Sequence, residues 1–310
     1  MRCLTANVMN TDFFFRLLFS GLTRGSIYAL IALGYTMVYG IIKLINFAHG
    51  EIYMIGAFTA LITAGALALA GFPAAVILLL AGLVAVIYSA AYGFTIEKIA
   101  YRPLRSAPRL SALISAVGMS LFLQEYVRLS QTSNFIAFPR LLPELPIPGG
   151  LQGIVTSPQA FILITTAVVM ILLTLLIRYT RIGKAMRATS QDRTMAMLVG
   201  VRVDRVISFT FIIGSATAAL GGLLISSFVG QINFFIGFLA GIKAFVAAVL
   251  GGIGSIPGAV LGGLILGMAE SFAAGYVSSV YEDVFAFVIL VLILIFKPSG
   301  ILGRPEVQKV

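Results

Sequence analysis

Long apolar segments, separated by short polar gaps, recur along almost the whole chain. A helix that crosses the hydrocarbon core of a bilayer needs about 20 mostly apolar residues. The pattern therefore predicts an all-α integral membrane protein, a polytopic bundle of eight to nine transmembrane helices in a single domain over residues 1–310. The expected spans are 18–42, 51–70, 74–96, 111–129, 159–178, 206–228, 238–253, 257–274 and 282–297.

The seventh and eighth of these segments are short for spanning helices. Each is either a full span or one half of a re-entrant pair of broken helices that meet inside the membrane. Full spans place the two termini on opposite sides of the membrane, with the N-terminus outside. A re-entrant pair lowers the number of spans by one and moves the N-terminal segment to the other side.

Basic residues are concentrated in three of the polar gaps, and cytoplasmic loops of membrane proteins carry an excess of Lys and Arg. They are Lys98, Arg102, Arg105 and Arg109 after the third span, Arg178, Arg181, Lys184, Arg187, Arg193, Arg202 and Arg205 after the fifth, and Lys297, Arg304 and Lys309 in the tail. The loop 179–205 and the C-terminus are therefore expected to be cytoplasmic. The proline-rich loop 130–158 has Arg140 as its only basic residue and is expected to face outside.

Composition agrees with a membrane protein and narrows the classes of partner. The chain is 60% hydrophobic and 10% charged, so it lacks the polar side chains that a soluble globule of this size needs to cover its surface. A net charge of +10 is, in a soluble protein, typical of one that binds nucleic acid. The basic residues lie in short loops without interleaved aromatic residues, however, so we expect the lipid bilayer and no nucleic acid as the partner.

Small residues recur at every fourth position in two of the predicted spans. Gly254, Gly258 and Gly262 form one row, and Gly214 and Gly222 belong to another. Such rows let helix backbones approach closely, so helix packing is the simpler interpretation. The alternative is that the segment 251–258 is a helix break that lines a translocation path, with Gly251, Gly254 and Pro257 as its candidate residues.

The stretch 45–51 contains the only histidine of the chain, His49, between Asn46 and Glu51. One interpretation is a helix start at the membrane surface, where an acidic residue in the first turn is favoured by the helix dipole. The other is a polar constriction or gate on the translocation path. The residues alone leave both open.

Two further charges, Lys243 and Glu270, lie close to apolar spans. Their predicted positions near the external ends of the spans favour side chains that extend to the interface. The sequence has no chain of intramembrane acids or histidines, and this argues against a proton-coupled secondary transporter.

No enzymatic motif is present. The sequence contains neither H-E-x-x-H nor G-x-S-x-G, so a metal centre or a catalytic nucleophile is not expected. A Walker A motif is also missing, since the fragment at 183–185 lacks the upstream glycine and the hydroxyl residue. We therefore expect no cofactor on this chain, and any ATP and Mg²⁺ to be bound by partner subunits.

The cytoplasmic loop 179–205 is too long and too rich in helix formers to be a plain connector. The segment 187–199 is expected to form a short helix that stops at Gly200. A short helix with small and apolar side chains suits either docking into the groove of a partner or lying on the membrane surface.

Several long motifs, in order, resemble the branched-chain amino acid ABC transporter permeases, most closely the leucine-transport type of the high-affinity leucine, isoleucine and valine system. They are GSIYALIALGYTMVYG at 25–40, INFAHGE at 45–51, YRPLR at 101–105, AFVAAVLGGIGSIPGA at 244–259 and GILGRPE at 300–306. The resemblance implies an importer of the bacterial inner membrane in which two homologous permease subunits, as a heterodimer, pair above two ATP-binding subunits. A periplasmic substrate-binding protein would deliver the amino acid.

The resemblance also assigns a coupling helix to 194–200, where Ala196 and Gly200 match the family pattern and Thr194 and Met195 depart from it. The implied ATPase-coupling residues are Arg193, Ala196, Leu198 and Gly200. Transport would follow alternating access, driven by the partner ATPase subunits. Two alternatives stay open: a related amide, urea or another amino acid as substrate, and a transporter or channel that acts without an ATPase.

Overall fold

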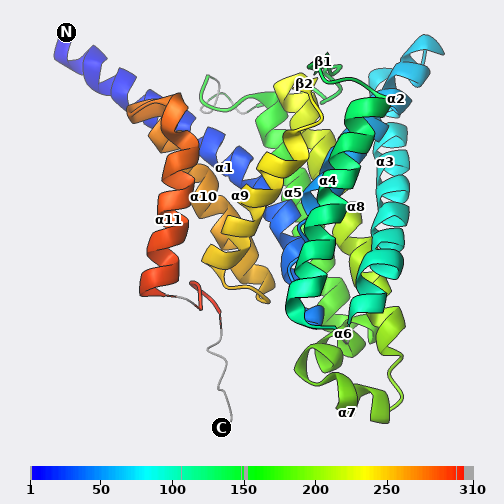
Figure 1. Ribbon diagram of the computed structural model, residues 1–310. Coiled ribbons are helices and arrows are strands. Elements are labelled where there is room, and N and C mark those ends of the chain that lie inside the picture. The colour runs from blue at the N-terminus through cyan, green and yellow to red at the C-terminus, as the bar shows by residue number, and fades with distance from the viewer. Residues whose placement is uncertain (1, 106, 148, 150–152, 298, 304–310) are drawn as a thin grey trace.

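A computed structural model describes residues 2–105, 107–147, 149, 153–297 and 299–303 as a helical bundle (Figure 1). Every predicted apolar segment is helical. Eight helices of the described part are long and apolar enough to cross a membrane, and α9 is a shorter apolar helix. The helices are α1 (Arg2–Ile42), α2 (His49–Leu69), α3 (Ala74–Ile96), α4 (Arg109–Ser130), α5 (Ser157–Tyr179), α8 (Val203–Val229), α9 (Ile236–Gly251), α10 (Ile256–Tyr276) and α11 (Glu282–Phe296).

The bundle has two distinct ends (Figure 1). The two short helices α6 (Arg181–Gln191) and α7 (Arg193–Leu198) form one end, which we call the α7 end. Strands β1 (Ile136–Ala137) and β2 (Gln231–Ile232) pair in an antiparallel manner at the opposite end, which is also where α1 begins. This small sheet joins the loop 130–158 to the α8–α9 connection and was not predicted from the sequence.

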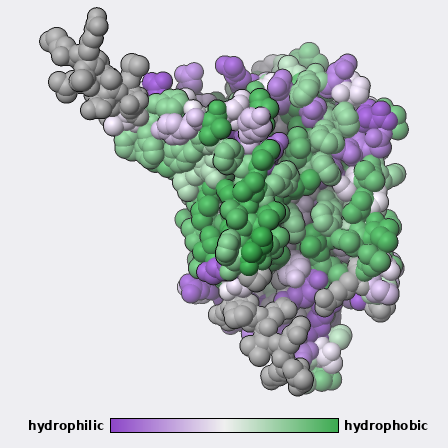
Figure 2. Space-filling view, turned by 60° about the vertical axis from the view of Figure 1, so that its left-hand side comes forward, coloured by the Kyte–Doolittle hydropathy of each residue, from purple (hydrophilic) through white to green (hydrophobic). Residues whose placement is uncertain are grey.

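Helix α1 is the most buried of the long helices, whereas α5 and α11 are mostly exposed. The surface confirms the expected division of side chains. A broad apolar band covers the α11 side of the molecule, and hydrophilic residues gather above and below it (Figure 2). This is the distribution that a lipid-facing surface requires.

Glycines allow the central helices to approach backbone to backbone. A β-carbon on Gly262 of α10 would lie 2.0 Å from the carbonyl oxygen of Ala247 in α9, and one on Gly258 would lie 2.3 Å from that of Gly251. On α8, a β-carbon on Gly222 would lie 2.4 Å from the carbonyl oxygen of Tyr53, and Gly214 faces Gly34 of α1. These close approaches lie at helix–helix contacts, as the small-residue rows require.

The connection between α1 and α2 returns into the bundle. Helix α1 ends at Ile42, yet the first residue of α2, His49, packs against Gly34, about 12 Å back along α1. Asn46 and Ala48 of the connection are buried. The predicted helix start is confirmed, with Glu51 in the first turn of α2, but its predicted location at the surface is wrong, because α2 begins inside the protein.

Candidate functional site

A cluster of polar side chains surrounds the buried start of α2. The hydroxyl of Tyr101 donates to Asn46 Oδ1 at 2.9 Å, and the ring of Tyr35 packs edge-on against His49 with the centroids 4.9 Å apart. The side-chain nitrogens Asn46 Nδ2 and His49 Nε2 are buried without a hydrogen-bond partner among the described residues. The structure thus brings the predicted residues Asn46 and His49 together inside the helical bundle.

Glu51 is the charged member of this cluster and is completely buried. Ser120, in the middle of α4, donates to Glu51 Oε1 at 3.1 Å. The second oxygen, Oε2, has no hydrogen-bond partner, and Glu51 takes part in no ion pair within the part of the chain that the structure describes. A buried carboxylate with a single hydroxyl donor is costly, so this position needs a functional explanation.

A small cavity of about 60 Å³ adjoins the cluster between α1, α4 and α9. Tyr35 and Ser120 provide its polar atoms, and the remaining wall is apolar. The lining residues are Tyr35, Phe47, Val117, Ser120, Leu121, Phe238, Gly241 and Ile242. The cavity therefore has one polar end and one apolar side, and Ser120 in its wall separates it from the Glu51 carboxylate.

The other candidate path residues, Gly251, Gly254 and Pro257, lie elsewhere. They form the turn between α9 and α10 at the α7 end, and Gly254 has a φ of 96°, which favours glycine. The backbone N–H groups of Ile301 and Leu302 bind the carbonyls of Leu250 and Gly251, both at 2.9 Å. Gly254 therefore belongs to a turn and not to the helical row of Gly258 and Gly262, and these three residues do not join the polar cluster.

The loop 179–205 contains two helices where the sequence predicted a single helix at 187–199. Asp192 is extended, with φ −153° and ψ 116°, and this ends α6. Its side chain then accepts from the N–H of Met195 at 3.0 Å and caps α7. The prediction of one helix gave no weight to Asp192, although Asp is a preferred N-cap residue and the start of a second helix was therefore a possible signal.

Helix α7 presents apolar side chains to the outside. The exposed residues are Met195, Met197, Leu198 and Val199, and Leu198 is 74% exposed. Ala196, by contrast, is only 3% exposed, so its interpretation as part of an exposed small patch is wrong. Gly200 ends the helix with a φ of 85°, which explains a glycine there without any partner contact.

Arg193, the first residue of α7, reaches the end of α1. Its Nε and Nη2 atoms donate to the carbonyl oxygen of Ile41 at 3.1 and 2.8 Å. Partial burial lowers the pKa of the Arg193 guanidinium, and the positive charge of Arg105 lowers it further. The bond ties α7 to the residue that precedes the buried α1–α2 connection.

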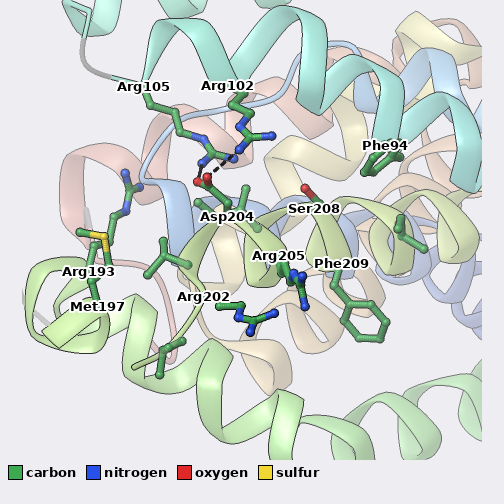
Figure 3. A pocket seen from close by; sticks show the side chains of 14 residues that line it. Phe94, Arg102, Arg105, Arg193, Met197, Arg202, Asp204, Arg205, Ser208 and Phe209 are labelled. Carbon is green, nitrogen blue, oxygen red and sulfur yellow. Dashed lines mark hydrogen bonds and ion pairs between the residues drawn. The ribbon is translucent and has the colours of Figure 1, made fainter. Parts of the chain in front are cut away.

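A pocket of about 850 Å³ lies beside α7 and is rich in arginine (Figure 3). Arg102 and Arg105 both bind the carboxylate of Asp204 at the start of α8, and Arg105 also binds Glu97, which is completely buried. Ser208 of α8 donates to Glu97 at 2.7 Å. These contacts link the α3–α4 turn to α8, beside α7.

A second buried charge cluster was missed by the sequence analysis. Lys243 of α9 lies 3.2 Å from Glu270 of α10 and 2.6 Å from Asp283 of α11, and Tyr28 of α1 donates to Glu270 at 2.7 Å. Glu270 is completely buried, so the expectation that it extends to the interface is wrong. The available signal was the presence of opposite charges in neighbouring apolar spans.

Among the described residues, no group of three or more His, Cys, Asp and Glu side chains could hold a metal ion.

Comparison with known proteins identifies the family. LivH of Salmonella typhimurium and BraD of Pseudomonas aeruginosa, both high-affinity branched-chain amino acid transport system permease proteins, are each 53% identical to this chain. The LivH alignment covers 96% of this chain and 98% of the relative, and the BraD alignment covers 94% and 97%. LivH of Escherichia coli K12 is 52% identical, and its alignment covers 96% of this chain and 98% of the relative. Residues 17–294 match the branched-chain amino acid transport system / permease component family, and the chain belongs to it.

Proposed function

We propose that this chain is the transmembrane subunit of an ATP-binding-cassette importer that moves leucine, isoleucine and valine across the bacterial inner membrane. The names of its relatives support the substrate class. The observation that carries the coupling mechanism is the exposed apolar face of α7, a short capped helix held outside the bundle. Such a face suits docking into a groove on an ATP-binding subunit.

The proposed complex contains a second, homologous permease subunit, two ATP-binding subunits and a periplasmic substrate-binding protein. The α7 end, with its arginine-rich pocket, is then cytoplasmic, in agreement with the excess of basic residues there. The contacts of Ile301 and Leu302 with the end of α9 support a cytoplasmic C-terminus. ATP and Mg²⁺ are held by the partner subunits, and selectivity is shared with the binding protein.

Two contacts could carry movement of α7 into the bundle. The first is the Arg193–Ile41 bond, which joins α7 to the end of α1. The second, the Arg105–Asp204 pair, contains no α7 residue and joins α8, which follows α7 in the chain, to the α3–α4 turn. Closure of the ATP-binding subunits would displace α7 and, through the first contact, the buried connection that carries Asn46 and Glu51. The result is alternating access by movement of packed helices.

Uptake of labelled leucine into proteoliposomes tests the function. The complex is reconstituted with binding protein outside and ATP inside. We expect uptake that needs both. Leucine uptake by this chain alone would contradict the proposal and indicate a secondary transporter. If a binding protein that carries another ligand stimulates ATP hydrolysis and leucine is not taken up, the importer is confirmed but its substrate is that other ligand.

A variant of α7 tests the coupling. We expect Leu198→Glu to lower leucine uptake and binding-protein-stimulated ATP hydrolysis by at least about tenfold, because a charge would enter an apolar docking surface. Insertion and co-purification of the permease pair should be unchanged. Arg181→Glu, at the start of α6, is the matched charge-changing control. Normal transport by a well-inserted Leu198→Glu protein would exclude α7 as the docking helix.

A further inference from the structure

We infer that Glu51 and the cavity beside it form a subsite for an aliphatic amino acid, in which the carboxylate of Glu51 binds the substrate's ammonium group and the apolar wall contacts its side chain. This inference rests on the proposed function, since it assigns to the importer the residues that meet its substrate during translocation.

The orientation of Glu51 is the first argument. It occupies the third position of α2, where an acidic side chain commonly folds back to cap its own helix. No side-chain cap bond is present at this end of α2. Glu51 instead points toward α4 and α9, where Ser120 binds one of its oxygens.

The facing side of α9 makes room for the carboxylate. A β-carbon on Gly237 would lie 2.5 Å from Glu51 Oε2, and one on Gly241 would lie 3.3 Å from the hydroxyl of Tyr35. Two glycines one turn apart thus expose the α9 backbone beside the carboxylate and the hydroxyl. A side chain at Gly237 would clash with the carboxylate oxygen that has no partner, so the glycine is needed to accommodate Glu51.

The number and kind of polar atoms favour an ammonium group over a metal cation. A carboxylate, a tyrosine hydroxyl and a serine hydroxyl come together here, while a hard cation such as Ca²⁺ takes about six to eight oxygen ligands. A primary ammonium has three donors, which matches this small set. It would also supply the positive charge that Glu51 lacks among the described residues.

The wall of the cavity matches the rest of the substrate. Phe47 and Leu121 line it together with Phe238 and Ile242 of α9, so an aliphatic chain next to the ammonium would meet apolar surface. A cavity of about 60 Å³ holds only part of such a ligand. Binding therefore requires α4 to move away from α9, and the Ser120–Glu51 bond lies between the two helices at this point.

The test uses leucine that carries a photoreactive diazirine in its side chain, with the complete transporter in proteoliposomes. We expect label on 117–121 of α4 and 238–242 of α9, suppressed by excess leucine and not by 4-methylpentanoate, which lacks the ammonium group. Glu51→Gln should lower both labelling and uptake by at least about tenfold, the loss expected when a hydrogen bond to a charged group is removed.

Controls separate this subsite from a structural role and from the proposed function. Glu125→Gln changes an exposed glutamate of the same α4 helix and should alter neither labelling nor uptake. Phe238→Trp, which keeps Glu51 and fills the cavity, should also lower labelling. Wild-type uptake with unchanged labelling in Glu51→Gln, or label on other segments, would overturn the subsite alone. A wild-type complex that takes up no leucine would overturn the proposed function, and the subsite with it.

Discussion

Two glutamates, Glu51 on α2 and Glu270 on α10, are completely buried inside the same bundle, but their surroundings differ. Glu270 has Lys243 at 3.2 Å and the Tyr28 hydroxyl at 2.7 Å. Glu51 has only the Ser120 hydroxyl, at 3.1 Å. One buried carboxylate is therefore neutralised by the protein, and the other is not.

The difference separates a structural role from a functional one. A buried ion pair avoids an uncompensated charge but leaves no capacity for a ligand. The Lys243–Glu270 pair, with Tyr28 and Asp283, joins α1, α9, α10 and α11 and is best explained as a connection between helices. A carboxylate oxygen that has no hydrogen-bond partner and lies near a cavity can still accept a hydrogen bond from a ligand.

The largest effect is expected from breaking the paired site. Lys243→Met leaves Glu270 buried without its cation and should lower the free energy of unfolding by about 3–5 kcal/mol, the usual cost of removing one partner of a buried pair. Thermal inactivation of the detergent-solubilised complex, followed by size-exclusion chromatography, measures it. The double variant Lys243→Met/Glu270→Leu should recover most of the loss, and a double variant as unstable as the single one would contradict the explanation.

The unpaired site should respond much more weakly to the loss of its charge. Glu51→Gln removes a buried charge that no cation compensates, so we expect the free energy of unfolding to change by no more than about 1 kcal/mol. The same thermal assay measures it. A large loss of stability in this variant would indicate that Glu51 is a structural residue, and it would remove the contrast with Glu270.

The smallest effect is expected at the surface. Glu125 and Arg128 form an exposed pair three residues apart on α4. Glu125→Gln should cost less than about 0.5 kcal/mol, because water screens exposed pairs and compensates for their loss. A cost as large as that of Lys243→Met would mean that burial does not explain the difference between these sites.

Local patterns were enough to predict the helices. Hydropathy over about 20 residues identifies a spanning helix without knowledge of its neighbours, so each predicted apolar segment proved helical. The prediction of 187–199 as one helix was wrong because its end depends on a single side chain, Asp192, that caps the next helix. Caps are short-range signals, but their use depends on the backbone around them.

The polar cluster could be predicted only in part. The stretch 45–51 was recognised as polar within an apolar chain, with a surface helix start and a gate as the two open alternatives. The choice depended on where α1 ends relative to the start of α2, which is a matter of packing. His49 proved to lie against Gly34, two turns back in α1, and this excludes the surface.

By itself the sequence determined that the chain is a helical membrane protein, which family it resembles, and where its basic end lies, because these properties follow from local composition and motifs. Only the tertiary structure decided which buried charges have partners. Lys243 and Glu270 belong to different helices, as do Glu51 and Ser120. Whether such side chains meet depends on the rotation and depth of whole helices, which are set by close approaches at glycines along their faces.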